Sequence, residues 1–418
     1  MDADVIVIGA GLAGLQSARR LQRDGHRVIV LEAEEAVGGR IRTDVIDGFR
    51  CDRGFQVLNP AYPAVRSWID LAALDLQRFG VGAAIRDATG IRTLAHPLRH
   101  PRHALGTLTS SRLTAAELAG LARWIVPTLL RATVASRATD DETLHDSFDR
   151  VGLTGPLRRD VLDTFLAGVL ADSSGTASAN YVRLLVRSFA LGAPGLPSAG
   201  MQALPEQMAA SLRDPVRLAT PARAVREGAG GVEVSTDSGA LRARAVIVAV
   251  DPQRIGELTD RPAPATHGLT TWWFSAPQSP RRGRFLVLDA SRPGGGPAGP
   301  VWNTAVVSEV APSYAPAGRH LIQATTLLDR PDGRADEHAV RRDLERIYGV
   351  STAGWEVLVH HVIPHTLPAQ PPPLVDRRRQ RIGEATWLVG DHRDTASIQG
   401  ALVSGDRAAR GLDGILTA

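Results

Sequence analysis

The chain has 418 residues, of which 44% are hydrophobic and 22% are charged. This apolar content excludes a disordered or fibrous protein and exceeds what one compact core usually holds, so two closely joined domains are expected. All 48 basic residues are arginine, and the formal net charge is only +4. Because the arginines are scattered among acids and form no tract interleaved with aromatic residues, nucleic acid is not expected as a partner.

The cysteine content and the chain ends favour a cytoplasmic protein. Cys51 is the single cysteine, so it can form neither an internal disulfide nor a metal cluster. Residues 2–8 lack the regions of a signal peptide. The apolar segment 118–130 is interrupted by Arg123 and Pro127 and is too short to span a membrane.

A dinucleotide-binding motif opens the chain. The β-branched run at residues 5–8 predicts a strand, and a helical pattern starts after the glycine turn. The turn has the spacing G-x-G-x-x-G, in which Gly9 allows a tight turn, Gly11 lets a pyrophosphate approach the backbone, and Gly14 lets the helix pack against the strand.

A second predicted strand, at residues 27–31, ends at Glu32. A carboxylate at this position can accept hydrogen bonds from a ribose 2′-OH and would repel a 2′-phosphate, which leaves NAD and FAD as cofactors. Gly38 and Gly39 then precede Arg40, which can return to the pyrophosphate.

Residues 5–43 resemble the N-terminal fingerprint of the FAD-dependent amine oxidase and carotenoid (phytoene) desaturase superfamily. The resemblance implies that Glu32 binds the adenosine ribose, that Arg40 lies along the diphosphate, and that residues 52–56 pass near the flavin ring. The cofactor-binding residues expected in this part of the chain are Gly9, Gly11, Leu12, Ala13, Gly14, Glu32, Ala33, Gly38, Gly39, Arg40, Gly54, Phe55 and Gln56.

The middle of the chain is expected to form the substrate domain. Residues 60–190 are predicted to be mainly helical, with amphipathic stretches at 64–76, 115–130 and 161–170. In the family, such helices form an insertion over the flavin. Strand-like runs at 270–274, 284–288, 301–307 and 320–328 predict a second sheet, which the family uses as the floor of the substrate cavity.

Between these parts, residues 196–205 resemble the family's glycine–methionine segment, which re-enters the cofactor domain. Strands are predicted at 216–220, 222–226, 232–236 and 241–250. The resemblance implies that the backbone of Ala222 meets the adenine.

Two other features are interpreted as structural. Adjacent strand residues point to opposite faces, so core packing is favoured over cavity lining for the aromatic run at residues 272–274. His360, His361 and His365 do not indicate a metal site, since two are adjacent and no Asp, Glu or Cys lies at ligand spacing.

A second cofactor motif lies near the C-terminus. A predicted strand at 385–389 leads into Gly390 and Asp391, and residues 397–405 open a final helix whose N-terminus can stabilise the negative charge of reduced flavin. This motif resembles the C-terminal motif of the superfamily. It implies that Asp391 binds the ribityl and phosphate region and that the backbone around Ile398 and Gln399 meets the pyrimidine end, with Ser397 and Ala401 also among the cofactor-binding residues.

The chain departs from the monoamine and polyamine oxidases in two respects. Those enzymes carry a lysine that reaches flavin N5 through water, and this chain has no lysine. They often have an aromatic residue before the C-terminal glycine–alanine pair, in the region where Ser397 stands here. Residues 397–401 resemble the plant-type carotenoid desaturases more closely. Because Cys51 lies far from this motif, non-covalent FAD is expected.

The predicted fold class is α/β, with a Rossmann-type, glutathione-reductase-like FAD-binding domain, a second α+β substrate-binding domain and a helical insertion. Residues 1–58, 196–262 and 376–418 are predicted to form the FAD-binding domain. Residues 59–195 and 263–375 are predicted to form the substrate-binding domain.

We expect an FAD-dependent oxidoreductase that transfers hydride from a C–N or C–C bond of a small organic molecule to flavin, with dioxygen or another electron acceptor. No catalytic acid or base is predicted, because FAD carries the chemistry. Gln56, Trp302 and His392 are predicted to face the substrate. The alternatives are a non-redox flavoprotein isomerase and a peripheral-membrane isoprenoid desaturase, which would need an exposed apolar patch within residues 115–130.

Overall fold

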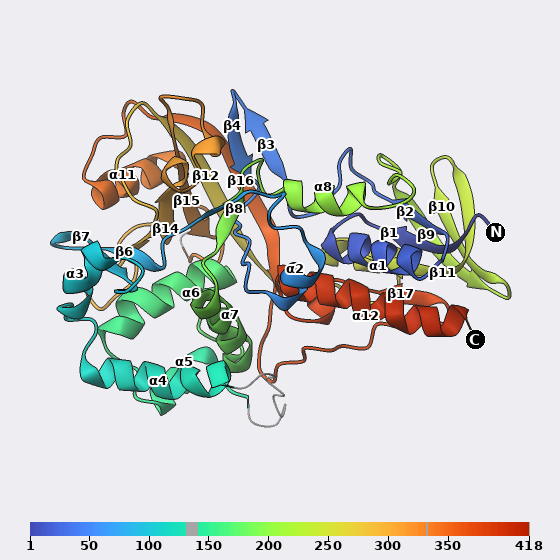
Figure 1. Cartoon of the computed structure of the whole chain (residues 1–418), viewed down its shortest axis with the longest axis horizontal. Helices are drawn as coiled ribbons and strands as arrows, with labels where there is room; N and C mark the ends of the chain where they lie inside the picture. The colour runs from blue at the N-terminus through green and yellow to red at the C-terminus, as the bar shows by residue number, and fades with distance from the viewer. Residues whose placement is uncertain (131–140, 332, 418) are drawn as a thin grey trace.

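Two β-sheets form the framework of the molecule (Figure 1). The computed structural model describes residues 1–130, 141–331 and 333–417. A six-stranded sheet has the order β2-β1-β11-β10-β9, with β17 beside β11, and a seven-stranded sheet has the order β16-β12-β15-β14-β13-β6-β7. In Figure 1 the six-stranded sheet lies at the right, near both chain ends, and the seven-stranded sheet lies at the upper left.

The six-stranded sheet is parallel at its centre, where β1 pairs with β2 and β11, and β11 pairs with β17. Such strands are buried on both faces, which explains their continuous apolar runs. Helices α1 and α12 pack side by side on this sheet, and the Ser17 hydroxyl donates to the carbonyl of Gly405 at 3.1 Å. The elements of this half are β1 (Ala3–Ile8), α1 (Leu12–Arg23), β2 (Val28–Leu31), α8 (Ala203–Ala210), β9 (Ala222–Gly228), β10 (Gly231–Thr236), β11 (Gly239–Val248), α9 (Ile255–Leu258), β17 (Thr386–Leu388) and α12 (Ile398–Leu416).

In the seven-stranded sheet, the predicted aromatic run lies on β12 and is entirely buried. Trp272 and Phe274 face the core beneath α11, whereas Trp273 faces the core shared with the other sheet, because successive strand residues alternate. The elements here are β6 (Gly82–Asp87), β7 (Gly90–Ala95), β12 (Thr266–Ala276), β13 (Leu286–Asp289), β14 (Asn303–Val306), α10 (Val307–Val310), β15 (His320–Leu327), α11 (Glu337–Tyr348) and β16 (Glu356–Pro368).

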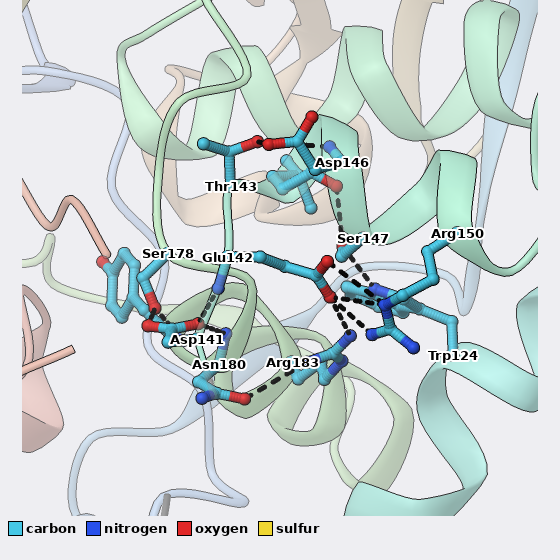
Figure 2. A network of polar contacts seen from close by, with 12 residues as sticks. Trp124, Asp141, Glu142, Thr143, Asp146, Ser147, Arg150, Ser178, Asn180 and Arg183 are labelled. Carbon is cyan, nitrogen blue, oxygen red and sulfur yellow. Dashed lines mark hydrogen bonds and ion pairs between the residues drawn. The ribbon is translucent and has the colours of Figure 1, made fainter. Parts of the chain in front are cut away.

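A layer of helices covers one side of the seven-stranded sheet, at the lower left of Figure 1. Figure 2 shows the polar contacts inside this layer, where the Trp124 indole donates to Ser147 at 2.9 Å. The Asp141 carboxylate accepts from the Ser178 hydroxyl at 2.6 Å and from the N–H of Leu374 at 2.7 Å, so it ties the layer to the returning chain. The layer contains α3 (Ala104–Leu108), α4 (Ala115–Leu130), α5 (Leu144–Arg150), a π-helical turn (Leu157–Leu162), α6 (Asp163–Leu170) and α7 (Ala179–Leu191).

Part of the helical prediction for residues 60–190 is wrong. The helix expected at 64–76 is only α2 (Pro63–Trp68), because the Asp70 carboxylate accepts from the N–H groups of Ala72 and Ala73 and starts a separate turn. Strands β6 and β7 also lie in this region, and β5 (Leu76–Arg78) pairs with β8 (Gly195–Pro197). Strand β6 pairs in parallel with β13, two hundred residues away, which a local pattern cannot reveal.

The strand expected at 216–220 is absent from the described structure. Arg217 makes only an isolated bridge with Leu31, and Ala219 has a φ of +47°, which ends any extended conformation. Residue 307 begins α10 rather than ending the strand predicted at 301–307.

A buried residue, Asp52, ties the seven-stranded sheet to a two-stranded hairpin and to the segment before α8. Asp52 ends β4 (Phe49–Asp52), which forms a hairpin with β3 (Thr43–Ile46). Its oxygens accept hydrogen bonds from Thr43 at 2.5 Å, from the N–H of Met201 at 3.0 Å and from the Tyr314 hydroxyl at 3.0 Å. The Trp273 indole donates to the Asp52 carbonyl at 3.1 Å, so one residue connects four segments.

This carboxylate makes stability depend on pH. Burial raises the pKa of Asp52 to about 6, against the opposing effect of its three hydrogen bonds. The native state therefore retains a proton that the unfolded chain releases near its ordinary pKa, and stability falls as the pH rises from about 4.5 to about 7. The loss at Asp52 should be about 2 kcal/mol over this range.

Between these two pH values, the free energy of urea unfolding should fall by about 2 kcal/mol more in the parent protein than in Asp52→Asn. The comparison is needed because burial also raises the pKa of Asp394 to about 6. Equal pH dependence in the two proteins would show that Asp52 is already ionised throughout the range.

Candidate functional site

One large cavity, of about 860 Å³, extends between the two sheets. We call the part lined by residues 8–62, 220–258 and 390–401 the dinucleotide end. We call the part lined by residues 79–113, 157–194, 269–303 and 366–367 the chamber. The cavity therefore joins the ends of the parallel strands to the second sheet and the helical layer.

At two positions of the glycine turn, a side chain would clash with neighbouring atoms. Gly9 has a φ of +104°, and a Cβ there would lie 2.6 Å from the carbonyl oxygen of Ala249. A Cβ at Gly14 would lie 2.0 Å from the Gly9 oxygen, so Gly14 serves the packing of α1 on the strand. Gly11 is different, because it lines the cavity and a Cβ there would meet nothing within 4 Å. It leaves open backbone beside the N-terminus of α1, which suits a phosphate group.

Glu32 has a second role that the sequence did not indicate. It lines the cavity at the end of β2 and is only 7% exposed. Its Oε2 atom accepts from the N–H of Ala10 at 2.7 Å and its Oε1 atom from the N–H of Glu34 at 3.0 Å. The carboxylate therefore fixes the glycine turn and still faces the space that a ribose would occupy.

Arg40 and Asp391, which are 351 residues apart, form an ion pair at 2.6 Å between Nη2 and Oδ1. The other guanidinium nitrogen donates to the carbonyl of Thr366 on β16 at 2.8 Å, and Gln56 donates to the Arg40 carbonyl at 2.8 Å. Arg40, Asp391 and Gln56 all line the cavity. The two cofactor motifs and the second sheet thus meet at one point.

Helix α12 directs its N-terminus into the cavity. The Ser397 side chain accepts from the N–H of Gly400 at 3.0 Å, and Ser397, Ile398 and Ala401 line the cavity. Gln399 points elsewhere, since its Oε1 atom accepts from the N–H of Ala64 at 2.9 Å. The N-termini of α1 and α12 therefore offer positive ends of helix dipoles to the same cavity.

His392 also lines the cavity and is 6% exposed. Burial lowers its pKa to about 4, so the imidazole is neutral at neutral pH. Neither ring nitrogen has a hydrogen-bond partner among the described residues. A buried ring with two unused nitrogens suits a ligand that supplies polar atoms.

Most of the other predicted residues line the main cavity, but Gly54 and Trp302 do not. Gly54 is not a lining residue: its φ is +86°, and a Cβ there would lie 3.0 Å from Ile363. Trp302 borders a separate cavity of about 200 Å³, because its neighbour Asn303 takes the face toward the main cavity. The remaining residues line the main cavity: Leu12, Ala13, Ala33, Gly38, Gly39, Phe55, Ala222 and Gly390.

Sequence reasoning missed two polar residues of the chamber, Tyr181 and Asn303. Tyr181 lies in a helix with no distinctive pattern. Asn303 lies with Thr304 in the middle of a mainly apolar predicted strand, which was a usable signal.

The three histidines near residue 360 have separate partners. His361 contacts Asp44 at 2.8 Å, His365 contacts the Thr266 hydroxyl at 2.8 Å, and His360 stacks on Trp272. Within residues 1–130, 141–331 and 333–417, no three His, Cys, Asp or Glu side chains are grouped as metal ligands would be.

Comparison with known proteins agrees with this geometry. The family model of flavin containing amine oxidoreductases matches residues 12–412. The chain belongs to this family. The resemblance predicted from the two motifs is thereby confirmed, as is the α/β fold with a Rossmann-type FAD-binding part.

The individual relatives differ widely from this chain in sequence. Putrescine oxidase of Kocuria rosea is 29% identical over 290 residues, covering 63% of this chain and 59% of that protein. The match thus spans less than two thirds of that relative. The structure of putrescine oxidase bound to putrescine has a TM-score of 0.72 at 19% identity, with 99% of both chains covered. An oxidoreductase from Methanosarcina mazei has a TM-score of 0.74 at 16% identity, with 97% of this chain and 99% of that chain covered.

The cofactor of this family member is FAD, and the dinucleotide end fits it. The open backbone at Gly11 suits the diphosphate, and the side of Glu32 that faces the cavity suits the ribose. The two unpartnered ring nitrogens of His392 could form hydrogen bonds with polar atoms of the cofactor.

The role of Glu32 can be tested by Glu32→Gln, which keeps the shape and removes the charge. A charged acceptor strengthens a hydrogen bond, so the FAD dissociation constant should rise by about 10-fold or more. Flavin fluorescence quenching on the apoprotein measures it. The matched control is Glu35→Gln, since Glu35 is exposed and does not line the cavity. Equal affinities for the two variants would remove Glu32 from the cofactor site.

Proposed function

We propose that this chain is an FAD-dependent oxidoreductase that dehydrogenates a small organic molecule at a C–N or C–C bond. The observation that carries the proposal is the continuous main cavity, in which a dinucleotide end opens directly into a largely apolar chamber. Bound FAD would supply the hydride acceptor, and dioxygen or another acceptor would take the electrons afterwards.

The residues of the chain then have simple roles. Gly11 and Glu32 bind the cofactor, the pair of Arg40 and Asp391 holds its middle, and the chamber excludes water from the reacting bond. His392 is proposed to meet the flavin or the substrate as a neutral ring, not as a proton donor.

We further propose that FAD is held without a covalent bond. Cys51 is buried on β4 and does not line the cavity. The domain division given by residues 1–58, 196–262 and 376–418 is likewise proposed, and every strand of the six-stranded sheet comes from these ranges.

Anaerobic mixing tests the reaction. The purified yellow protein should release its flavin on acid precipitation and should bleach with at least one member of a panel of amines and unsaturated lipids. A protein that neither contains FAD nor takes it up would contradict the proposal, and bleaching without net oxidation of the substrate would indicate the isomerase alternative.

A second candidate, a peripheral-membrane form of the same enzyme, is favoured by one surface. Leu98, Leu105 and Leu108 are 89%, 76% and 71% exposed, and Leu118 and Leu130 on α4 are also exposed. Within residues 88–116, which contain no acid, Arg92, Arg99 and Arg102 are exposed, whereas Arg112 is buried in ion pairs with Asp87 and Asp160. Exposed leucines among cations suit an anionic lipid surface. None of the helices in the described residues is long and apolar enough to cross a membrane.

Vesicle flotation checks this surface. The protein should float with vesicles that contain phosphatidylglycerol and not with pure phosphatidylcholine, and the double substitution Leu98→Glu and Leu105→Glu should abolish flotation. Leu191→Glu is the control, because Leu191 is 50% exposed on α7, away from the basic segment. Equal flotation of all variants would exclude residues 98–105 as the contact.

A further inference from the structure

Among the residues that the structure describes, none contributes an ionised side chain to the chamber. Every Asp, Glu and Arg that lines the main cavity comes from residues 32–53, 251–254 and 391, on the cofactor side. The walls contributed by the second sheet and the helical layer are mostly apolar and include Phe79, Val161, Phe165, Phe189, Leu286 and Leu288. A protonated amine would find no counter-ion there, and its burial would be costly.

Three polar side chains interrupt these walls, and two of them are already engaged. The Tyr181 hydroxyl donates to the carbonyl of Ala396 at 2.6 Å, and the Thr366 hydroxyl donates to the carbonyl of Ile363 at 3.0 Å. The third is Asn303, which is 5% exposed at the start of β14. Its amide is a free donor on these walls. Elsewhere in the cavity, the Asn59 amide nitrogen is also buried without a hydrogen-bond partner, in the loop before α2.

A buried chain of hydrogen bonds engages one end of the Asn303 amide. The Thr325 hydroxyl donates to Oε1 of Gln323 at 3.2 Å. The Gln323 amide nitrogen donates to Oδ1 of Asn303 at 3.2 Å. Nδ2 of Asn303 is therefore left over, and it has no hydrogen-bond partner among the described residues.

The helix opposite makes room for this nitrogen. Gly168 on α6 lines the chamber, and a Cβ at that position would lie 2.3 Å from Asn303 Nδ2. The flanking residues Phe165 and Val169 are apolar and also line the chamber. Nδ2 thus takes the space that a side chain at position 168 would fill, between apolar residues of α6.

We propose that Asn303 is the polar anchor of the substrate, and that it selects an uncharged, largely apolar molecule with an oxygen acceptor such as a carbonyl or hydroxyl group. This inference rests on the proposed function, because it assigns the substrate of the same cavity. Gln323 is a positioning residue, since it acts through Asn303.

Calorimetric titration with three probes of one skeleton tests the anchor. Acetophenone carries a ketone oxygen, 1-phenylethylamine carries an ammonium group at neutral pH, and ethylbenzene carries neither. Acetophenone should bind most tightly and 1-phenylethylamine most weakly. Asn303→Leu should weaken acetophenone binding by about 10-fold, the effect of one hydrogen bond, and leave ethylbenzene binding unchanged.

Gly168→Ala is a second variant, which keeps the Asn303 side chain. Alanine has a higher helix propensity than glycine, so α6 should remain folded. The added methyl group would take the space of Nδ2 and displace the Asn303 amide. This variant should cause the same selective loss for acetophenone. Equal weakening of acetophenone and ethylbenzene in both variants would overturn the proposal, as would tighter binding of 1-phenylethylamine by the parent protein. The titrations are run without dioxygen, so that the flavin is not reoxidised. The heat then measures binding, and the flavin absorbance of the same sample shows separately whether the flavin is reduced, which tests the proposed function.

Discussion

The contact between Arg40 and Asp391 joins the parts of the molecule that make the site. One guanidinium bonds to the C-terminal motif through Asp391 and to the second sheet through the carbonyl of Thr366. Asp391 is almost fully buried, so loss of Arg40 would leave a buried charge uncompensated, at a cost of about 3–5 kcal/mol. The cofactor cradle therefore exists only when the N-terminal glycine turn, the last helix and β16 are all in place.

This arrangement separates charge from apolar surface along a single cavity. The dinucleotide end carries the ionised side chains and two helix N-termini, as an anionic cofactor requires. The chamber beyond carries none, and its one free donor is held by Gln323. The chain thus has the fold of an amine oxidoreductase family, but the described residues of its chamber offer no counter-ion to a protonated amine. The two findings are compatible, because substrate choice depends on the side chains that line a site and not on the fold alone.

The cofactor half was largely predictable from the sequence because its signals are local. The glycine spacing at residues 9–14, the carboxylate at Glu32 and the strand–glycine–helix pattern near Asp391 each reflect a constraint within a few residues. The chamber was less accessible to such reasoning. Strand β6 is defined by pairing with β13, and the direction of Asn303 depends on Gln323 across the sheet. Trp302 and Asn303 show the limit most clearly, since one step along the strand decides which of two cavities a side chain meets.

The central claim, that three distant segments form one cofactor site beside a separate chamber, is tested most directly by hydrogen–deuterium exchange with and without FAD. The account predicts simultaneous protection of residues 9–14, 38–40 and 390–401, with residues 104–130 unchanged. Protection confined to the N-terminal segment, or spread over the helical layer, would contradict it.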